Sequence, residues 1–82
     1  MSDVHELESP LMGTFYRSSA PGEPPLTEAG KSVKTGDVVC VIESMKIFTE
    51  LRCDHDGTVK EILAENEEMV MKGQVLMRIE KS

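Results

Sequence analysis

One lysine stands where the chain could present a nucleophilic amine to another enzyme. The run Val38 to Ile42 is continuously apolar and rich in β-branched residues, and Glu43 to Leu51 is a second β-compatible run. If the two runs pair as a hairpin, the chain must reverse near Met45-Lys46, which places Lys46 at the tip. A primary amine on a four-carbon stem at such a tip can be reached and acylated by a modifying enzyme.

The turn residues leave two interpretations of Lys46 open. Met45-Lys46 is not a preferred turn dipeptide such as Asn-Gly, and an exposed Met beside a Lys at a reversal costs stability. This indicates that the turn is kept for something other than stability. The alternative is a solvated surface lysine whose neighbours Met45 and Ile47 merely pack along an edge.

An internal repeat indicates which elements position this hairpin. Gly36 and Gly73 lie thirty-seven positions apart, and Val38 to Glu43 and Val75 to Glu80 match around them. Gly13-Thr14 is echoed by Gly57-Thr58 at a spacing of forty-four, so the first copy holds seven extra residues. Each copy therefore has a turn followed by a strand, and the approximate symmetry places the hairpin tip opposite the chain end.

The extra residues fall in the only Pro-rich stretch of the chain. Prolines remove backbone donors and fix φ, so the stretch suits a stiff protruding loop and not a strand interior. The expected insertion therefore lies within about 18–25, the stretch Ser18, Ser19, Ala20, Pro21, Gly22, Glu23, Pro24 and Pro25.

One segment conflicts with an all-β interpretation. Val59 to Lys72 has apolar residues at helical spacing, contains no Gly or Pro, and is rich in good helix formers. Local propensity alone predicts a helix there. We nevertheless expect strands, because Gly57-Thr58 repeats Gly13-Thr14, because Gly73 closes a turn in phase with Gly36, and because the family resemblance described below implies them.

Length and composition limit the other possibilities. A chain of 82 residues has room for one small core, which must be built from Val, Ile, Leu and Met because there is no Trp. The net charge of -6 and the lack of a basic run argue against nucleic acid as a partner. No apolar run is long enough for a membrane helix, so we expect a soluble, cytoplasmic protein without a membrane partner.

Residues 1–8 are polar and are expected to be a lead-in or the end of a linker, with the domain at 9–82.

Outside the hairpin, residues of types that often take part in catalysis or metal binding are expected to have structural roles only. His5 and His55 have no second ligand at metal spacing, so no metal site is expected. Cys40 should pack as a free thiol in an apolar run, and we expect no disulfide with Cys53. Phosphate-binding loops and nucleophile motifs are absent, so no catalytic residue is expected. Three of the six methionines, Met69, Met71 and Met77, could line an interaction surface but are expected to fill the core, because the chain is poor in aromatic residues.

Taken together, these motifs resemble the biotinyl domains of biotin carboxyl carrier proteins, in particular those of bacterial-type acetyl-CoA carboxylase. The resemblance runs from about Ser9 to Glu80 and includes the insertion, which is similar to the "thumb" of these carriers. Ser44 and Ile47 depart from the family's usual Glu-Ala-Met-Lys-Met hairpin. Lipoyl domains usually place Asp before and Ala after their lysine, and neither is found here. The residues that carry the resemblance are Gly13 to Arg17, the thumb at 18–25, Val33 to Asp37, Glu43 to Lys46, Gly57 to Val59 and the closing strand Val75 to Glu80.

The resemblance implies a fold and a function. The fold is an all-β flattened sandwich, or barrel-sandwich hybrid, of two four-stranded antiparallel sheets with a quasi-two-fold repeat. Biotin protein ligase would attach biotin covalently to Lys46, which is flanked by Glu43, Ser44, Met45 and Ile47. Biotin would be carboxylated on the biotin carboxylase subunit and would deliver the carboxyl group to acetyl-CoA at the carboxyltransferase, forming malonyl-CoA for fatty acid biosynthesis.

In this interpretation the chain is a non-catalytic carrier. The isolated domain is expected to be monomeric, and the longer parent chain is expected to be oligomeric. Two alternatives remain open: a lipoyl-type acyl carrier of an oxo-acid dehydrogenase, and an unmodified β-sandwich interaction module.

Overall fold

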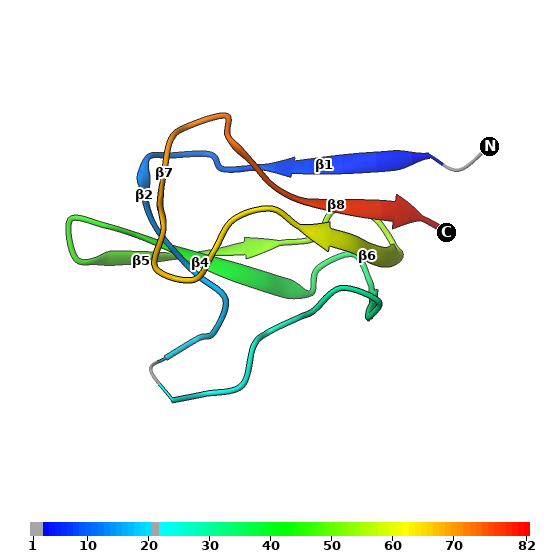
Figure 1. The fold of residues 1–82 in the computed structure, drawn as a ribbon, viewed down its shortest axis with the longest axis horizontal. Coiled ribbons are helices and arrows are strands. Elements are labelled where there is room, and N and C mark those ends of the chain that lie inside the picture. The colour runs from blue at the N-terminus through cyan, green and yellow to red at the C-terminus, as the bar shows by residue number, and fades with distance from the viewer. Residues whose placement is uncertain (1–2, 21) are drawn as a thin grey trace.

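A computed structural model describes residues 3–20 and 22–82, and eight strands form the whole of its regular structure there (Figure 1). One sheet has the order β1-β8-β6-β3 and the other β5-β4-β2-β7, with every pair of neighbours antiparallel. The predicted all-β sandwich of two four-stranded sheets is confirmed, and its extents of 40 × 26 × 20 Å are those of a flattened body. The strands are β1 (Val4–Glu8), β2 (Gly13–Tyr16), β3 (Ser32–Val33), β4 (Val38–Ser44), β5 (Ile47–Arg52), β6 (Gly57–Ile62), β7 (Met69–Val70) and β8 (Val75–Lys81).

The internal repeat seen in the sequence is a repeat in space. Exchanging β1 with β5, β2 with β6, β3 with β7 and β4 with β8 converts one sheet order into the other. The loops obey the same relation, because the Gly36 amide donates to the Cys53 carbonyl at 2.7 Å and the Gly73 amide donates to the Ser9 carbonyl at 2.8 Å. The two copies therefore interlock, each supplying strands to both sheets.

Two equivalent glycines let two strands within each copy approach each other closely. A Cβ at Gly13 would collide with the Glu43 carbonyl of β4, and one at Gly57 would collide with the Glu80 carbonyl of β8. Only glycine fits where one strand passes this near another backbone. This explains the Gly-Thr echo from which the repeat was first inferred.

The inward faces of both sheets share one hydrophobic core. Phe15 on β2 and Ile42 on β4 are fully buried, as are Leu76 and Ile79 on β8. The core members are Leu7, Phe15, Val33, Val39, Cys40, Ile42, Leu51, Cys53, Val59, Ala64, Val70, Leu76, Met77 and Ile79.

The structure corrects the expectation that Met69, Met71 and Met77 all fill the core. Met77 is fully buried in β8, as predicted, but Met69 is 62% exposed and Met71 is 56% exposed. Successive side chains of a strand point to opposite faces, and in β7 it is Val70 that points inward. Met69 and Met71 are therefore surface residues, and the prediction that they fill the core was wrong.

The segment with helical propensity forms strand β6, then a loop, then the short strand β7. Val59 is buried between the sheets, while its neighbours Thr58 and Lys60 are exposed, which is the period-two pattern of a strand. β6 pairs with β8 on one side and β3 on the other. Tertiary pairing thus overrides local propensity, as the repeat and the family resemblance together had predicted.

Residues 4–8 require a correction. They were expected to belong to a polar lead-in, but they form β1, which pairs with β8 from Val4–Glu80 to Glu8–Val75. Only Leu7 in this strand is buried, because β1 is an edge strand with most of its side chains in solvent. Its polar composition therefore hid a structural element. Met1 and Ser2, also assigned to the lead-in, lie outside the described residues.

The two ends of the molecule differ. The chain ends lie together at one end of the long axis, and the β4–β5 hairpin extends from the other (Figure 1). The predicted placement of the tip opposite the chain end is thereby confirmed. Across 3–20 and 22–82 there is no helix long and apolar enough to cross a membrane.

Candidate functional site

The β4–β5 hairpin closes with a two-residue turn at Met45-Lys46. Ser44 on β4 faces Ile47 on β5 as the last pair of the ladder. Met45 has φ 52° and Lys46 has φ 66°, so both central residues are left-handed, as in a type I′ turn. Left-handed backbone costs a non-glycine residue about 1–2 kcal/mol, which Asn-Gly in the same place would largely avoid. The sequence therefore keeps a strained turn at the tip.

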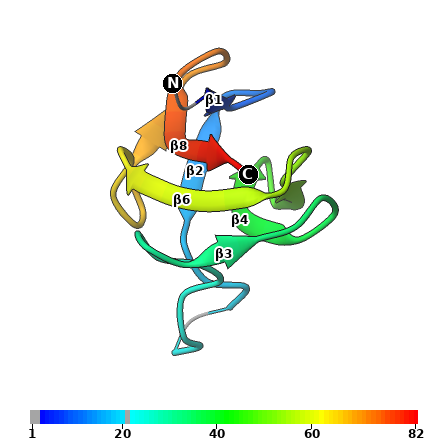
Figure 2. The same ribbon diagram turned by 90° about the vertical axis from the view of Figure 1, so that its right-hand side faces the viewer.

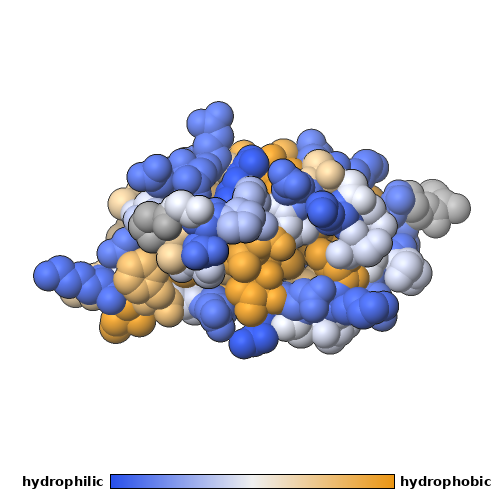
Figure 3. Space-filling model, turned by 90° about the horizontal axis from the view of Figure 1, so that it is seen from below, coloured by the Kyte–Doolittle hydropathy of each residue, from blue (hydrophilic) through white to orange (hydrophobic). Residues whose placement is uncertain are grey.

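The tip is exposed and unusually apolar. Met45 is 92% exposed, Ile47 is 67% exposed and Phe48 is 60% exposed, with Lys46 exposed among them. Figure 3 shows apolar side chains at the hairpin end of the molecule, on the left. Apolar groups held together in solvent beside the Lys46 amine favour contact with another protein. The geometry thus places Lys46 where the sequence predicted it, and its modification stays a prediction.

The base of the hairpin is braced from the neighbouring strand. The Tyr16 hydroxyl of β2 donates a hydrogen bond to Glu43 Oε1 of β4 at 3.0 Å. The Tyr16 ring lies 6.4 Å from the Phe48 ring, and Phe48 pairs with Glu43 across the hairpin. The hydrogen bond to Glu43, followed by burial and the Glu43 charge, raises the pKa of Tyr16 above its ordinary 10.0. These contacts fix the direction in which the hairpin extends.

The loop between β2 and β3 projects from the sandwich (Figures 1 and 2). Its base is closed where the Leu26 amide donates to the Arg17 carbonyl at 2.8 Å, so residues 18–20 and 22–25 belong to the projecting part. The Arg17 amide also donates to Asn66 Oδ1 at 2.9 Å, which ties this base to the loop before β7. Pro21 lies outside the described residues. The role of the thumb, as predicted from the sequence, is not tested by its position.

A groove separates the thumb from the hairpin. It has a volume of about 500 Å³, which lies within the range of small-molecule sites. Aromatic side chains from the hairpin and its brace form one part of it, and small thumb residues form another. The lining consists of Tyr16, Ser18, Ser19, Ala20, Gly22, Val41, Phe48, Asn66 and Glu67.

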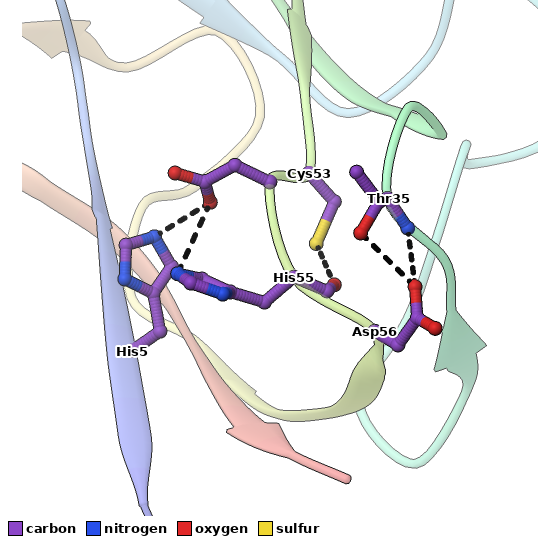
Figure 4. Close-up of polar contacts among 6 residues, drawn as sticks. His5, Thr35, Cys53, His55 and Asp56 are labelled. Atoms are coloured by element: carbon purple, nitrogen blue, oxygen red, sulfur yellow. Dashed lines mark hydrogen bonds and ion pairs between the residues drawn. The ribbon is translucent and has the colours of Figure 1, made fainter.

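A second cluster lies elsewhere and was not predicted. His5 on β1 and His55 in the β5–β6 turn have ring centroids 4.4 Å apart (Figure 4). His5 Nε2 lies 2.9 Å from Asp54 Oδ1, and His55 Nε2 lies 3.9 Å from the same oxygen. The two histidines lie fifty positions apart in the sequence, which hid this arrangement. The only signal for it was the repeat, which could have indicated that the segment before Ser9 is the counterpart of β5.

The two cysteines occupy different places in the fold, Cys40 within β4 and Cys53 directly before the β5–β6 turn. Both are free and buried. Burial raises the pKa of the Cys40 thiol to about 12, so this group stays protonated and packs as a small apolar side chain. The Cys53 thiol donates to the His55 carbonyl at 2.8 Å and thereby shapes the β5–β6 turn.

A flattened sandwich of two interlocked copies, with a lysine on an exposed two-residue turn, defines the class of biotinyl and lipoyl domains. The sequence comparisons identify the family within that class. A family described as "Biotin-requiring enzyme" matches residues 5–79, so the chain belongs to this family.

Individual relatives agree with this assignment. The chain is 51% identical over 69 residues to "Biotin carboxyl carrier protein of acetyl-CoA carboxylase, chloroplastic" from Glycine max, covering 84% of this chain and 26% of that protein. It is 49% identical over 74 residues to the "Biotin carboxyl carrier protein of acetyl-CoA carboxylase" of Nostoc sp., covering 90% of this chain and 41% of that protein. The chain therefore spans less than half the length of these curated relatives.

One solved structure, the "Kluyveromyces lactis Urea Carboxylase", is similar to this chain in sequence as well as in fold. It matches with a TM-score of 0.78 and 31% identity, covering 94% of this chain and 6% of the urea carboxylase. One small domain of a much larger carboxylase thus has the same fold as this chain.

Proposed function

We propose that this chain is the biotin carrier domain of an acetyl-CoA carboxylase, with biotin attached through an amide bond to Lys46. The observation that carries the proposal is a lysine on a strained, exposed and apolar two-residue turn in a member of a biotin-requiring family. Strain kept in this way is typical of functional positions.

The residues around Lys46 suit covalent attachment of biotin. The lysine stem is free on both sides, because Met45 and Ile47 are themselves largely in solvent. A ligase could therefore bring an activated biotin carboxyl group to Nζ without opening the sandwich. The apolar side chains offer the ligase a contact surface, and Glu43 and Ser44 complete the residues that flank the site in β4.

The same geometry suits carriage between two active sites. The β4–β5 hairpin, whose turn carries Lys46, extends away from the chain ends along the long axis, so the tip can enter a partner's active site while the chain ends stay outside (Figure 1). When bound, biotin supplies a ureido nitrogen that accepts and releases a carboxyl group. The chain contributes reach, orientation and a raised local concentration, and the chemistry takes place on the partners.

The choice of acetyl-CoA carboxylase has separate support. The relatives with the highest identities above are named as carriers of that enzyme, in a plant and in Nostoc. The expected partners are a biotin protein ligase, a biotin carboxylase subunit and carboxyltransferase subunits. Malonyl-CoA for fatty acid biosynthesis in the cytoplasm would be the product of the assembled enzyme.

A carboxylase assay tests this function. The ligase-treated chain is added to a biotin carboxylase with bicarbonate and ATP, and then to an acetyl-CoA carboxyltransferase. We expect malonyl-CoA to form with the native chain and to be lost in Lys46→Arg, which keeps the charge but removes the amine that biotin acylates. Carboxylation of the carrier without malonyl-CoA formation would support a biotin carrier but contradict the choice of acetyl-CoA carboxylase.

The thumb can be tested in the same assay. Replacing residues 18–25 by Gly-Gly should leave the sandwich folded, because the Arg17–Leu26 hydrogen bond closes the base without the projecting part. We expect malonyl-CoA formation to fall, since the replacement removes one wall of the groove beside the hairpin. A folded variant with normal turnover would show that the thumb has no part in the reaction.

A further inference from the structure

The cluster of His5, Asp54 and His55 lies outside the lysine site. One ligand atom from each of the three residues lies within 4.8 Å of the other two. His5 Nε2 and His55 Nε2 both face the same carboxylate oxygen, Asp54 Oδ1, at 2.9 Å and 3.9 Å. Figure 4 shows His5 reaching from β1 and His55 from the turn, with their dashed lines meeting at one oxygen.

The contact between His5 and Asp54 is close but poorly aligned. His5 Nε2 is buried and makes no hydrogen bond within the part of the chain that the structure describes, although Asp54 Oδ1 lies 2.9 Å away. A buried ring nitrogen without a hydrogen bond is costly, and a shared cation would provide its missing partner. The local geometry therefore favours a ligand between the three side chains.

The turn that carries two of the three side chains is fixed on both flanks. The Cys53 amide donates to the Asp37 carbonyl at 2.8 Å, and the Cys53 thiol donates to the His55 carbonyl at 2.8 Å. Asp56 accepts from both the amide and the hydroxyl of Thr35, at 2.8 Å and 3.0 Å (Figure 4). Asp54 and His55 are thus presented from a backbone that needs little rearrangement to bind an ion.

We propose that His5, Asp54 and His55 form a binding site for a divalent transition-metal ion of the Zn²⁺ type. Imidazole nitrogens and one carboxylate oxygen are ligands that this class of ion prefers. Tetrahedral Zn²⁺ with bonds of about 2.0–2.1 Å places its ligand atoms about 3.3 Å apart. The observed 2.9 Å and 3.9 Å bracket that spacing, and water would fill the remaining position.

The ion would join two parts of the fold that are distant in sequence. His5 belongs to β1, the edge strand that begins the described chain, whereas Asp54 and His55 belong to the turn connecting β5 and β6. Binding would hold β1 against this turn and stabilise the end of the molecule where the chain termini lie. The lysine tip lies at the opposite end, so the metal site is independent of the proposed carrier function (Figure 1).

Isothermal titration of the chelator-treated chain with zinc chloride alone tests the proposal. We expect one ion per chain, with binding weakened at least about tenfold in each of His5→Gln, His55→Gln and Asp54→Asn. Thermal unfolding should shift upward by about 10 °C when free Zn²⁺ is about a hundredfold above the Kd, because only the folded chain assembles the three ligands.

Matched variants distinguish zinc binding at this site from zinc binding elsewhere on the chain. Glu8→Gln removes another exposed carboxylate from β1 and should bind zinc as the native chain does. Lys46→Arg should also bind zinc normally, because it changes only the opposite end. Lack of zinc binding by the native chain would overturn the proposal, and so would binding that survives unchanged in both histidine variants.

Discussion

Two side chains at the tip depart from what a hairpin turn favours. Met45 and Lys46 both adopt positive φ without being Gly or Asn, and Met45 is almost completely exposed. Neither feature helps the domain fold. Both are accounted for if the tip is a surface that partner enzymes bind and if Lys46 is the residue they modify.

The titration of Tyr16 reports directly on its hydrogen bond to Glu43 at the base of the hairpin. It is the only tyrosine in the chain, so its phenolate absorbance in the near ultraviolet reports one group. Its hydrogen bond to Glu43 raises the pKa, so the titration should lie above the ordinary 10.0. In Glu43→Gln the pKa should move back toward 10.0, because the negative charge is gone. An unchanged titration in this variant would show that the Glu43 contact is not formed in solution.

Cys40 predicts a pH dependence of stability. Burial raises its pKa from 9.0 to about 12 in the folded chain, so the unfolded thiol loses its proton first as the pH rises. This contribution to stability is complete below pH 9.0 and is lost progressively as the pH approaches 12, at up to about 1.4 kcal/mol per pH unit. The free energy of unfolding, measured by urea denaturation, should therefore fall more steeply with pH in the native chain than in Cys40→Ala. Equal slopes would contradict a buried Cys40 thiol.

The hairpin is the element on which the proposed function depends. Its strands β4 and β5 pair over most of their length and extend to the Met45-Lys46 turn, and Tyr16 braces their base. A paired stem gives the tip a fixed direction, whereas a flexible loop would not.

The turn itself can be exchanged. Replacing Met45-Lys46 by Asn-Gly, the preferred type I′ pair, should raise the free energy of unfolding by about 1–2 kcal/mol, because left-handed strain is relieved at both positions. Lys46→Arg alone keeps the strain and should leave stability near that of the native chain. Chemical denaturation of the three proteins measures this. A double variant no more stable than the native chain would mean that the turn is not strained.

Sequence reasoning predicted the hairpin and the repeat because both depend on local signals. Gly36 and Gly73 mark equivalent turns, Gly13 and Gly57 mark equivalent close approaches, and an apolar run precedes the lysine. The role of β1 was missed, because an edge strand with one buried residue has almost no hydrophobic pattern.

The contact between His5 and His55 was missed for a related reason. It is made by β1 and a turn that are far apart in the sequence, and pairing across such a distance leaves no local trace. The surface positions of Met69 and Met71 were also not predicted, because composition does not indicate which face of a short strand is buried.

At the scale of the whole molecule, the hairpin tip and the chain ends lie at opposite ends of the long axis. The two-fold repeat returns the chain to its starting end, so that N and C lie near each other and the hairpin extends the opposite way (Figure 1). The equivalent of the β4–β5 hairpin in the second copy would join β8 to β1, and there the chain is open. The symmetry therefore places the closed β4–β5 tip at the end of the molecule opposite the chain ends.

Intact-protein mass tests most directly whether Lys46 accepts biotin. The native chain, Lys46→Arg and the control Lys34→Arg, which alters another exposed lysine, are each incubated with a biotin protein ligase, biotin and ATP. We predict a gain of one biotinyl group in the native chain and in Lys34→Arg, and none in Lys46→Arg. No gain in the native chain with a ligase active on another substrate, or a gain that persists in Lys46→Arg, would contradict the account.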